Sequence, residues 1–379
     1  MSSFNNFINQ QKPKLRAHLT NRKGKKIVGK YIIIESDDWG AIRTPSKNAL
    51  QAFKNKGLDA ANSVYKNDSL ESNEDVDMLF NVLQSFKDVN GRSLVITANV
   101  IMGNPDFEKI KESNFTQYHC QHFTDTLNQY PNHHQVFSSY QKATDNGLFM
   151  PQFHGREHLQ FARWLKVLQT GNANALFCFN YGATYSGKAD YSFMEALDWD
   201  NPTDVELQKN IITQGLTMFK NTFGFNSTSF IAPCYNWDSA LENHLHNNGI
   251  DIIQGTRFQF SPTGTFEKYH LIPHYFGQKN SSGSMYNIRN CFLEPSINSN
   301  KDWVDTCLAE ISAAFLWNKP AVICSHRINY VGFINEKNRD RGLHDLSAVI
   351  KKALKKWPDV QFISTNQLLE MKYLNEVQV

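Results

Sequence analysis

The feature that most limits the possible folds is a series of short apolar runs separated by amphipathic segments. Each run is short enough for one buried strand, and several are almost entirely apolar, which is typical of a parallel sheet covered on both faces. The segments between them carry apolar residues at helical spacing. We expect strands at 31–36, 94–100, 149–154, 175–180, 228–233, 249–254, 321–326 and 360–364, and helices near 204–222, 238–247, 301–317 and 343–356.

This alternation predicts an α/β fold, a distorted (β/α)7-type barrel with long loop insertions. We place the insertions near 55–93 and 114–148, which do not fit the regular strand–helix units. No Pro/Gly-rich linker divides the chain. Residues 30–379 are therefore expected to form a single barrel domain, preceded by a basic arm at 1–29.

Charge is small overall but uneven along the chain. The net charge is +3, and no helix-turn-helix, zinc-finger or RNP-like pattern is present, so nucleic acid is not an expected partner. Residues 1–30 carry eight Lys or Arg and no Asp or Glu. Such an arm is either a solvated, flexible terminus or a surface for anionic lipid headgroups or a phosphorylated ligand.

Features of targeting and redox chemistry favour a cytoplasmic protein. No apolar segment typical of a secretory signal follows the first Met, and no run approaches the roughly 18 apolar residues of a membrane span. The six Cys are scattered, and several lie in apolar runs where a reduced thiol is expected. We expect a protein of the cytoplasm, either free or peripheral to the inner face of the membrane through residues 1–30.

Polar residues cluster where several of the predicted strands end. Asp37 and Asp38 follow the first strand, His154 closes the third with His158 four positions later, and His326 follows the apolar run AVICS. In a parallel β/α barrel the carboxyl ends of the strands form one face. These side chains are therefore expected to converge on one site.

The residue types in this cluster favour a metal site. Two uncompensated carboxylates at the end of an apolar strand are costly to bury, and a bound cation is one compensation. His154 and His158, expected on the first turn of a helix, can face one ion. With Asp38 they leave positions open for water, as in catalytic zinc sites. The alternatives are a pair of capping or surface histidines and a solvated aspartate turn.

Five short motifs carry a resemblance to a known family. The chain resembles the polysaccharide deacetylase (NodB-homology) family of the glycoside hydrolase/deacetylase barrel superfamily. The motifs are SDDWG (36–40), HGREH (154–158), IAPCY (231–235), CSH (324–326) and STNQLLEM (364–371).

The resemblance implies a division of labour among the clustered residues. Asp37 would be the catalytic base, and Asp38, His154 and His158 would hold one divalent ion, with zinc the expected metal. His326 would be the acid that protonates the leaving amine. These parts are also what amide hydrolysis requires.

Three further residues are implied to lie beside the substrate. A backbone N–H near Cys234 or Tyr235 would help to hold the oxyanion. Trp39 stands where the family usually has a glycine, so it would narrow the site or offer a stacking face.

One family feature is missing from its usual place. An arginine that orients the base aspartate normally precedes the proline–tyrosine pair, but Ile231 or Ala232 occupies the matching position. Arg156, Arg257 and Arg327 are the candidates to replace it.

The predicted function is metal-dependent removal of an N-acetyl group from a sugar or saccharide precursor, including nucleotide-linked and lipid-linked sugars. One alternative is a glycoside hydrolase on a related barrel, which would use two carboxyls separated by about 5–9 Å. Its possible donors are Glu35, Asp37, Glu157 and Glu294. Another alternative is a non-catalytic metal-binding scaffold protein.

Overall fold

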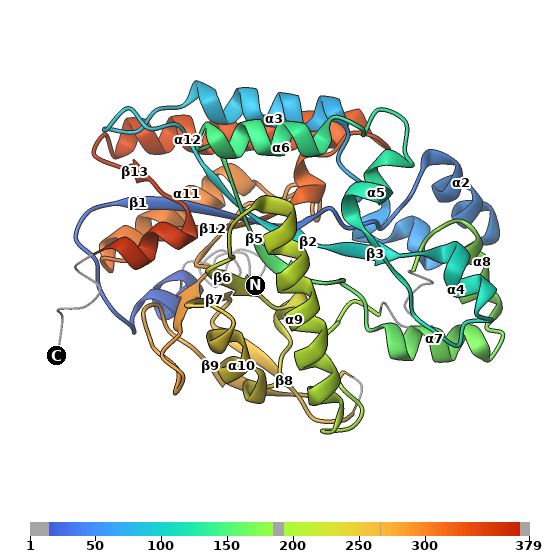
Figure 1. Ribbon diagram of the computed structural model, residues 1–379. Helices are drawn as coiled ribbons and strands as arrows, with labels where there is room; N and C mark the ends of the chain where they lie inside the picture. The colour runs from blue at the N-terminus through green and yellow to red at the C-terminus, as the bar shows by residue number, and fades with distance from the viewer. Residues whose placement is uncertain (1–14, 185–192, 266, 372–379) are drawn as a thin grey trace, which may run out of the picture.

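The computed structural model describes residues 15–184, 193–265 and 267–371. Strand β1 lies near the middle of a curled parallel sheet (Figure 1). Nine strands of these residues form the sheet, in the order β10-β7-β6-β5-β2-β1-β12-β11, with β13 also beside β1. They are β1 (Tyr31–Trp39), β2 (Ile96–Ile101), β5 (Phe149–Gly155), β6 (Ser229–Ile231), β7 (Ile252–Gly255), β10 (Met285–Ile288), β11 (Cys291–Phe292), β12 (Ala321–His326) and β13 (Gln361–Phe362). Two antiparallel pairs lie outside it, β3 (Gly103–Pro105) with β4 (Cys120–His122) and β8 (Phe258–Pro262) with β9 (Tyr269–Pro273).

The two edges of the sheet are brought together by a very short connection. Only Arg289 and Asn290 separate the edge strands β10 and β11, and three Cα steps of about 3.8 Å limit the gap to about 11 Å. The N–H of Arg289 donates to Gly255 O of β7, and the N–H of Asn290 donates to Val322 O of β12. The sheet is therefore a distorted α/β barrel with a seam at residues 289–290, which confirms the predicted fold class.

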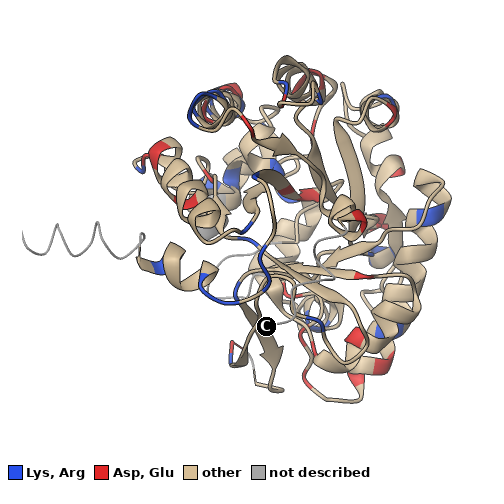
Figure 2. Cartoon of the chain, turned by 90° about the vertical axis from the view of Figure 1, so that its left-hand side faces the viewer, with Lys and Arg blue, Asp and Glu red and all other residues tan. Residues whose placement is uncertain are grey.

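Helices cover the outside of the curled sheet, and several are seen end-on around it in Figure 2. Helices α12, α3 and α6 lie along one side, α9 packs on β5, and α11 packs on β11, β12 and α12. The α-helices are α2 (Lys47–Lys56), α3 (Asn73–Ser85), α4 (Phe107–Glu112), α5 (Phe123–Asn128), α6 (Val136–Asp145), α7 (Phe161–Gln169), α8 (Ala173–Asn180), α9 (Asp204–Phe223), α10 (Glu242–Asn247), α11 (Trp303–Leu316) and α12 (Glu336–Lys356). The 3-10 turns are η1 (Asp59–Asn62), η2 (Val64–Asn67), η4 (Pro233–Tyr235), η5 (Ser239–Leu241), η6 (Arg327–Tyr330) and η7 (Thr365–Glu370).

The two segments expected as insertions each contribute a helix to this outer layer. Helix α3, within 55–93, buries Val76 and Leu79 in the main core, and α6, within 114–148, buries Val136 and Tyr140 there. The apolar stripe of each helix faces the sheet, which is why both belong to the barrel wall.

One predicted strand is wrong. Residues 175–180, ALFCFN, form most of helix α8. The side chain of Asn172 caps this helix by accepting hydrogen bonds from the N–H groups of Asn174 and Ala175. A short apolar run is compatible with either a buried strand or a buried helix, and here the cap decides in favour of the helix.

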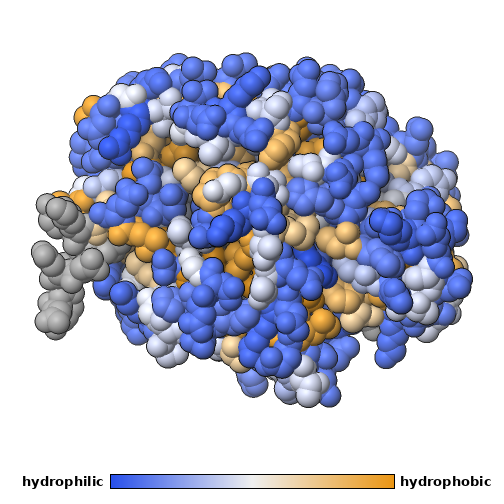
Figure 3. All heavy atoms as spheres, viewed as in Figure 1, coloured by the Kyte–Doolittle hydropathy of each residue, from blue (hydrophilic) through white to orange (hydrophobic). Residues whose placement is uncertain are grey.

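The face of the molecule shown in Figure 3 is mainly hydrophilic. Figure 3 shows a face on which apolar residues are seen mostly in hollows between polar ones. In the part of the chain that the structure describes, no helix combines the length and the apolar character needed to cross a membrane.

Helix α12 presses closely on the turn that follows β12. A Cβ added at Gly342 of α12 would lie 1.7 Å from the backbone oxygen of Asn329 in η6. Alanine normally favours a helix over glycine by about 1 kcal/mol. Here we expect Gly342→Ala to lower the free energy of unfolding by about 1–3 kcal/mol, because the helix must move away from η6.

Denaturant unfolding measures this change. Lys351→Ala, at an exposed position of the same helix, is the control and should stay within about 0.5 kcal/mol of the wild type. Unchanged stability of Gly342→Ala would mean that α12 and η6 are not in tight contact.

Candidate metal and catalytic site

The carboxyl ends of β1, β5 and β12 bring the clustered residues together. Asp37 lies directly opposite His326 in the β1–β12 pairing. The pairing of β1 with β2 is irregular between Ser36 and Trp39, and Asp38 has a left-handed backbone φ of 73°. Neighbouring side chains of a regular strand point to opposite faces, and an irregularity of this kind re-aims one of them. This distortion lets both Asp37 and Asp38 serve the same site.

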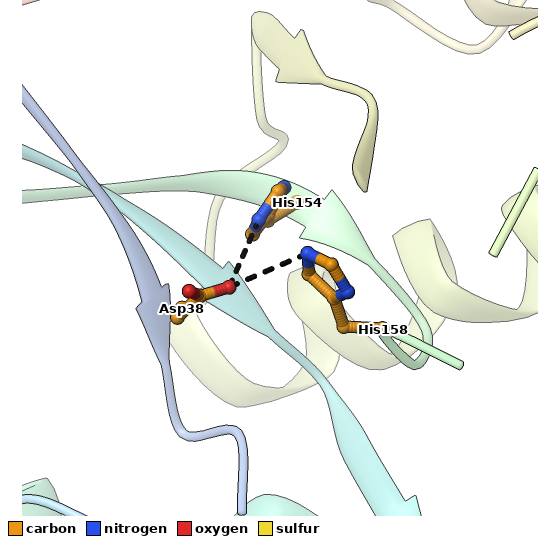
Figure 4. Close-up of side chains that lie close together, drawn as sticks. All are labelled: Asp38, His154 and His158. Atoms are coloured by element: carbon orange, nitrogen blue, oxygen red, sulfur yellow. Dashed lines mark ion pairs between the residues drawn. The ribbon is translucent and has the colours of Figure 1, made fainter. Parts of the chain in front are cut away.

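Asp38, His154 and His158 form a compact buried group (Figure 4). The Asp38 Oδ1 atom lies 3.4 Å from His154 Nε2 and 3.5 Å from His158 Nε2. Ligand atoms on a tetrahedral ion with bonds of about 2.0–2.2 Å are about 3.3–3.5 Å apart, so the spacing fits three ligands of one ion. His158 does not lie on a helix as expected, because β5 ends at Gly155 and α7 begins only at Phe161.

Both histidines present their Nε2 atoms in a form suited to an ion. The Nδ1 atom of His154 donates to Ile231 O across 2.9 Å, so Nε2 is the ring nitrogen that faces Asp38. Burial, reinforced by the Arg43 charge, holds the pKa of His158 well below its usual range, so this imidazole is neutral. Its Nδ1 is buried without a hydrogen-bond partner among the described residues. This donor set fits a divalent cation.

Asp37 is held by an arginine that the sequence interpretation missed. Arg289 Nη1 and Nη2 lie 2.5 and 2.6 Å from the two Asp37 oxygens, and Nε lies 2.7 Å from Glu35 Oε2. Burial alone would raise the pKa of Asp37, but the Arg289 guanidinium outweighs it and holds that pKa well below its ordinary value. Asp37 is therefore a carboxylate throughout the physiological pH range.

None of the three arginines expected near Asp37 contacts it in the described structure. Arg156 binds Glu157, and Arg327 binds Asp68 and Glu71 in a separate buried network, while Arg257 packs on Phe258. The available signal was the one used for the other residues, a polar side chain directly after a strand. It was missed because β10 is only four residues long and was not among the predicted strands.

His326 is oriented by a second carboxylate. Its Nδ1 lies 2.6 Å from Glu294 Oε1, and its Nε2 lies 3.8 Å from Asp37 Oδ2. Burial would lower the pKa of His326, but Glu294 raises it well above its ordinary value. The side chain is 28% exposed, so a charged imidazole here still reaches solvent. The result is a proton donor facing Asp37 from the opposite strand.

Trp39 does not line the site, which corrects the expectation. It is only 1% exposed and packs edge-on against Tyr140 and Phe149 in the main core. Its indole N–H donates to Ser36 Oγ. No face of the ring is left for a sugar.

Cys234 and Tyr235 follow β6 in the turn η4, where both have left-handed φ values of 55° and 58°. The N–H of Tyr235 already donates to Ala232 O, so of the two expected oxyanion donors only the Cys234 N–H remains a candidate. The Tyr235 hydroxyl lies 3.2 Å from Arg289 Nη1. Tyr235 therefore supports the group that holds Asp37.

The carboxyls considered for a glycoside hydrolase are each bound to a basic side chain. Glu35 and Asp37 share Arg289, Glu157 pairs with Arg156, and Glu294 binds His326. A glycosidase needs one carboxyl as a free acid and a second as base or nucleophile across the sugar bond. None of these four carboxyls is free of a basic partner.

Comparisons with known proteins give structural likeness alone. No protein-family model and no curated protein matches the chain. A "probable polysaccharide deacetylase" from Pseudomonas aeruginosa PAO1 is 10% identical, with 92% of each chain covered and a TM-score of 0.43. The alpha-amylase AmyC from Thermotoga maritima is 10% identical, with 93% of this chain and 76% of that chain covered and a TM-score of 0.47.

A third likeness is to the Xyl-CE4 domain of a multidomain xylanase from the hindgut metagenome of Trinervitermes trinervoides. It is 13% identical, with 90% of this chain and 91% of that chain covered and a TM-score of 0.35. Likeness at these identities and TM-scores carries no information on substrate or reaction.

The Arg289–Asp37 pair predicts a pH-dependent stability defect. Because Arg289 lowers the pKa of Asp37 in the folded state, the pair stabilises the fold fully above the ordinary pKa of about 4 and is lost as the pH falls below it. Arg289→Gln removes the guanidinium that binds both Asp37 and Glu35. We expect the free energy of unfolding to fall by about 3–5 kcal/mol at pH 7.

Urea unfolding at pH 7 and pH 3 tests this, because the deficit should shrink as the pH falls below the ordinary pKa of about 4 and the wild type loses the contribution of the pair. Arg289→Lys should recover part of the loss, and Arg22→Gln, which removes an exposed charge, should cost little. A deficit of the same size at both pH values would contradict the electrostatic explanation.

Proposed function

We propose that the protein is a metal-dependent hydrolase that removes an N-acetyl group from a sugar or saccharide precursor. The observation that carries the proposal is the buried Asp38–His154–His158 group, with the Asp37 carboxylate and the charged His326 beside it. The five sequence motifs that resemble polysaccharide deacetylases supply the reaction class.

The ligands would hold one divalent ion, for which we propose zinc. Such an ion lowers the pKa of an adjacent water towards about 7 and polarises the acetyl carbonyl. Asp37 then orients the attacking water and accepts its proton. Since the pKa of Asp37 is low, it is a weak base, and it takes the proton only as the amide carbon is attacked.

His326 would complete the reaction by protonating the amine as the C–N bond breaks. Its Nδ1 is bound to Glu294, so the proton that it can give is on Nε2, the atom facing Asp37. The N–H of Cys234, in the turn η4 that follows the short strand β6, would stabilise the oxyanion.

Loss of a metal ligand and loss of the base should have different effects on metal content. His154→Ala and His158→Ala should each lose stoichiometric metal, measured by elemental analysis of purified protein, together with acetate release from N-acetyl sugars. Asp37→Asn is the matched control: it should keep near-normal metal while acetate release falls by about 10² to 10⁴.

Full metal content in a double His154/His158 variant would remove these residues as ligands. If the Asp37→Asn protein lost its metal but stayed active, Asp37 would be the metal ligand and Asp38 the base.

His326 predicts a difference between amide and ester substrates. A departing amine must gain a proton, whereas a nitrophenolate leaves without one. His326→Ala should keep its metal and lose far more activity, about 10² or greater, on an N-acetyl sugar than on 4-nitrophenyl acetate. Equal losses on the two substrates would indicate a positioning role, and undiminished amide hydrolysis would exclude His326 from the reaction.

For the setting of the substrate, we propose a cytoplasmic protein that lies against the inner face of the membrane and acts on a nucleotide-linked or lipid-linked sugar. The described part of the basic arm is anchored to the barrel. Residues 15–21 are helical, Asn290 Nδ2 donates to Asn21 Oδ1 across 2.8 Å, and the N–H of Lys25 donates to Phe276 O. Blue segments of the ribbon mark the Lys and Arg residues of this stretch in Figure 2.

Vesicle co-sedimentation tests the membrane contact. Replacing Arg22, Lys23 and Lys26 by Gln should weaken binding to phosphatidylglycerol vesicles, with the effect shrinking at high salt. The control replaces Lys351 and Lys355, which are exposed on α12. Equal sedimentation of wild type and arm variant at low salt would exclude a role of the arm in membrane contact.

A further inference from the structure

A cavity of about 340 Å³ opens between η2, the segment that follows β11, and the start of α12. Three of its eleven lining residues are cations, Lys66, Lys337 and Arg341, and none is an acid. Seven others are Asn or Ser, so the wall is rich in hydrogen-bond donors. We call this space the rim cavity.

The cations of the rim cavity have no carboxylate partner among the described residues. Arg341 Nη2 donates to the backbone oxygen of Pro295, and its Nε is buried without a hydrogen-bond partner. By contrast Arg339, two residues earlier in α12, binds Glu74 and Asp75. Three positive charges in one concavity repel one another, and an anion with several acceptor oxygens relieves that repulsion.

The wall of the rim cavity nearest His326 is connected to it by hydrogen bonds. The Ser296 N–H in this wall donates to Asn329 Oδ1, and Asn329 Nδ2 donates to Glu294 Oε2. Glu294 in turn holds His326 through its other oxygen. One chain of contacts therefore joins the cavity wall to the proposed proton donor.

The wall of the rim cavity that contains Lys66 is connected by contacts to the proposed metal ligand Asp38. Lys66 lies in the segment between Tyr65 and Asp68, which is fixed by hydrogen bonds from Thr44 to the backbone oxygens of both residues. The neighbouring Arg43 lies 3.4 Å from Asp38 Oδ1. Two walls of the cavity are therefore connected by short chains of contacts to residues of the candidate site.

We propose that the rim cavity binds a phosphate-class group of the substrate while the N-acetyl group lies at the metal site. This inference rests on the proposed function and narrows its substrate to N-acetyl sugars that carry a phosphate ester or diphosphate. A phosphate offers three or more oxygens and up to two charges, which match several cations and amide donors better than a single carboxylate does.

Calorimetric titration of metal-free protein tests the cavity separately from the reaction. Chelation removes any ion that would itself bind phosphate. The probes are N-acetylglucosamine, its 1-phosphate and its 6-phosphate, and inorganic phosphate. We expect at least one sugar phosphate to bind tenfold or more tightly than the neutral sugar, with the advantage shrinking as salt is raised.

The charge-removing variant replaces Lys66, Lys337 and Arg341 by Gln. It should abolish the advantage of the phosphorylated sugar and the binding of inorganic phosphate. A matched variant replaces three exposed cations outside the cavity, Lys142, Lys351 and Lys355, and should behave as the wild type. Equal affinity for phosphorylated and neutral sugars, or an unchanged advantage in the cavity variant, would overturn the proposal.

Two further measurements distinguish a lipid headgroup from a soluble sugar phosphate, and failure of the proposed function from failure of the anion site. Phosphatidylglycerol vesicles that bind the wild type but not the cavity variant would assign the phosphate to a lipid headgroup rather than to a soluble sugar. If no N-acetyl sugar releases acetate with metal-loaded protein, yet phosphate binding is lost in the cavity variant, the proposed function fails and the anion site stands.

Discussion

Arg289 meets two requirements of the structure with one guanidinium. It neutralises the buried carboxylates Glu35 and Asp37 on the central strand β1, and its backbone lies in the two-residue seam that joins the sheet edges. A buried carboxylate without a partner would cost several kcal/mol. Closure of the barrel therefore supplies the charge that keeps Asp37 ionised.

The ionisable groups of the site lie in two separate places around the Arg289–Asp37 pair. Asp38 lies with His154 and His158 in one group, whereas the charged His326 lies with Glu294 beside Asp37. Environments that push pKa values apart are how one site contains both a base and an acid. The rim cavity adds a third charged group, cations that have no acidic partner among the described residues.

Much of the site could be predicted from sequence because parallel strands end at one face. That rule placed Asp37, Asp38, His154, His158 and His326 together, and the structure brings them together. It could not place Arg289, nor Glu294 as the partner of His326, since their strands β10 and β11 have only four and two residues and are too short to stand out in the sequence. Nor could it show which way a side chain points, so Trp39 was assigned to the site although it lies in the core. The alternation of apolar runs and amphipathic segments predicted the fold class correctly. The segment ALFCFN was assigned to a strand wrongly, because its helix depends on the cap at Asn172.

The central place of β1 has a consequence for synthesis on the ribosome. Asp38, His154 and His158 all lie in the first half of the chain, but Arg289, which is 252 residues from Asp37, and strand β12 are made much later. A nascent chain can therefore gather the three ligands early, while Asp37 and Glu35 still lack their cation. Until the seam residue emerges, the half-built sheet has an open edge and unpaired acids at its centre, the state in which a chaperone is most needed.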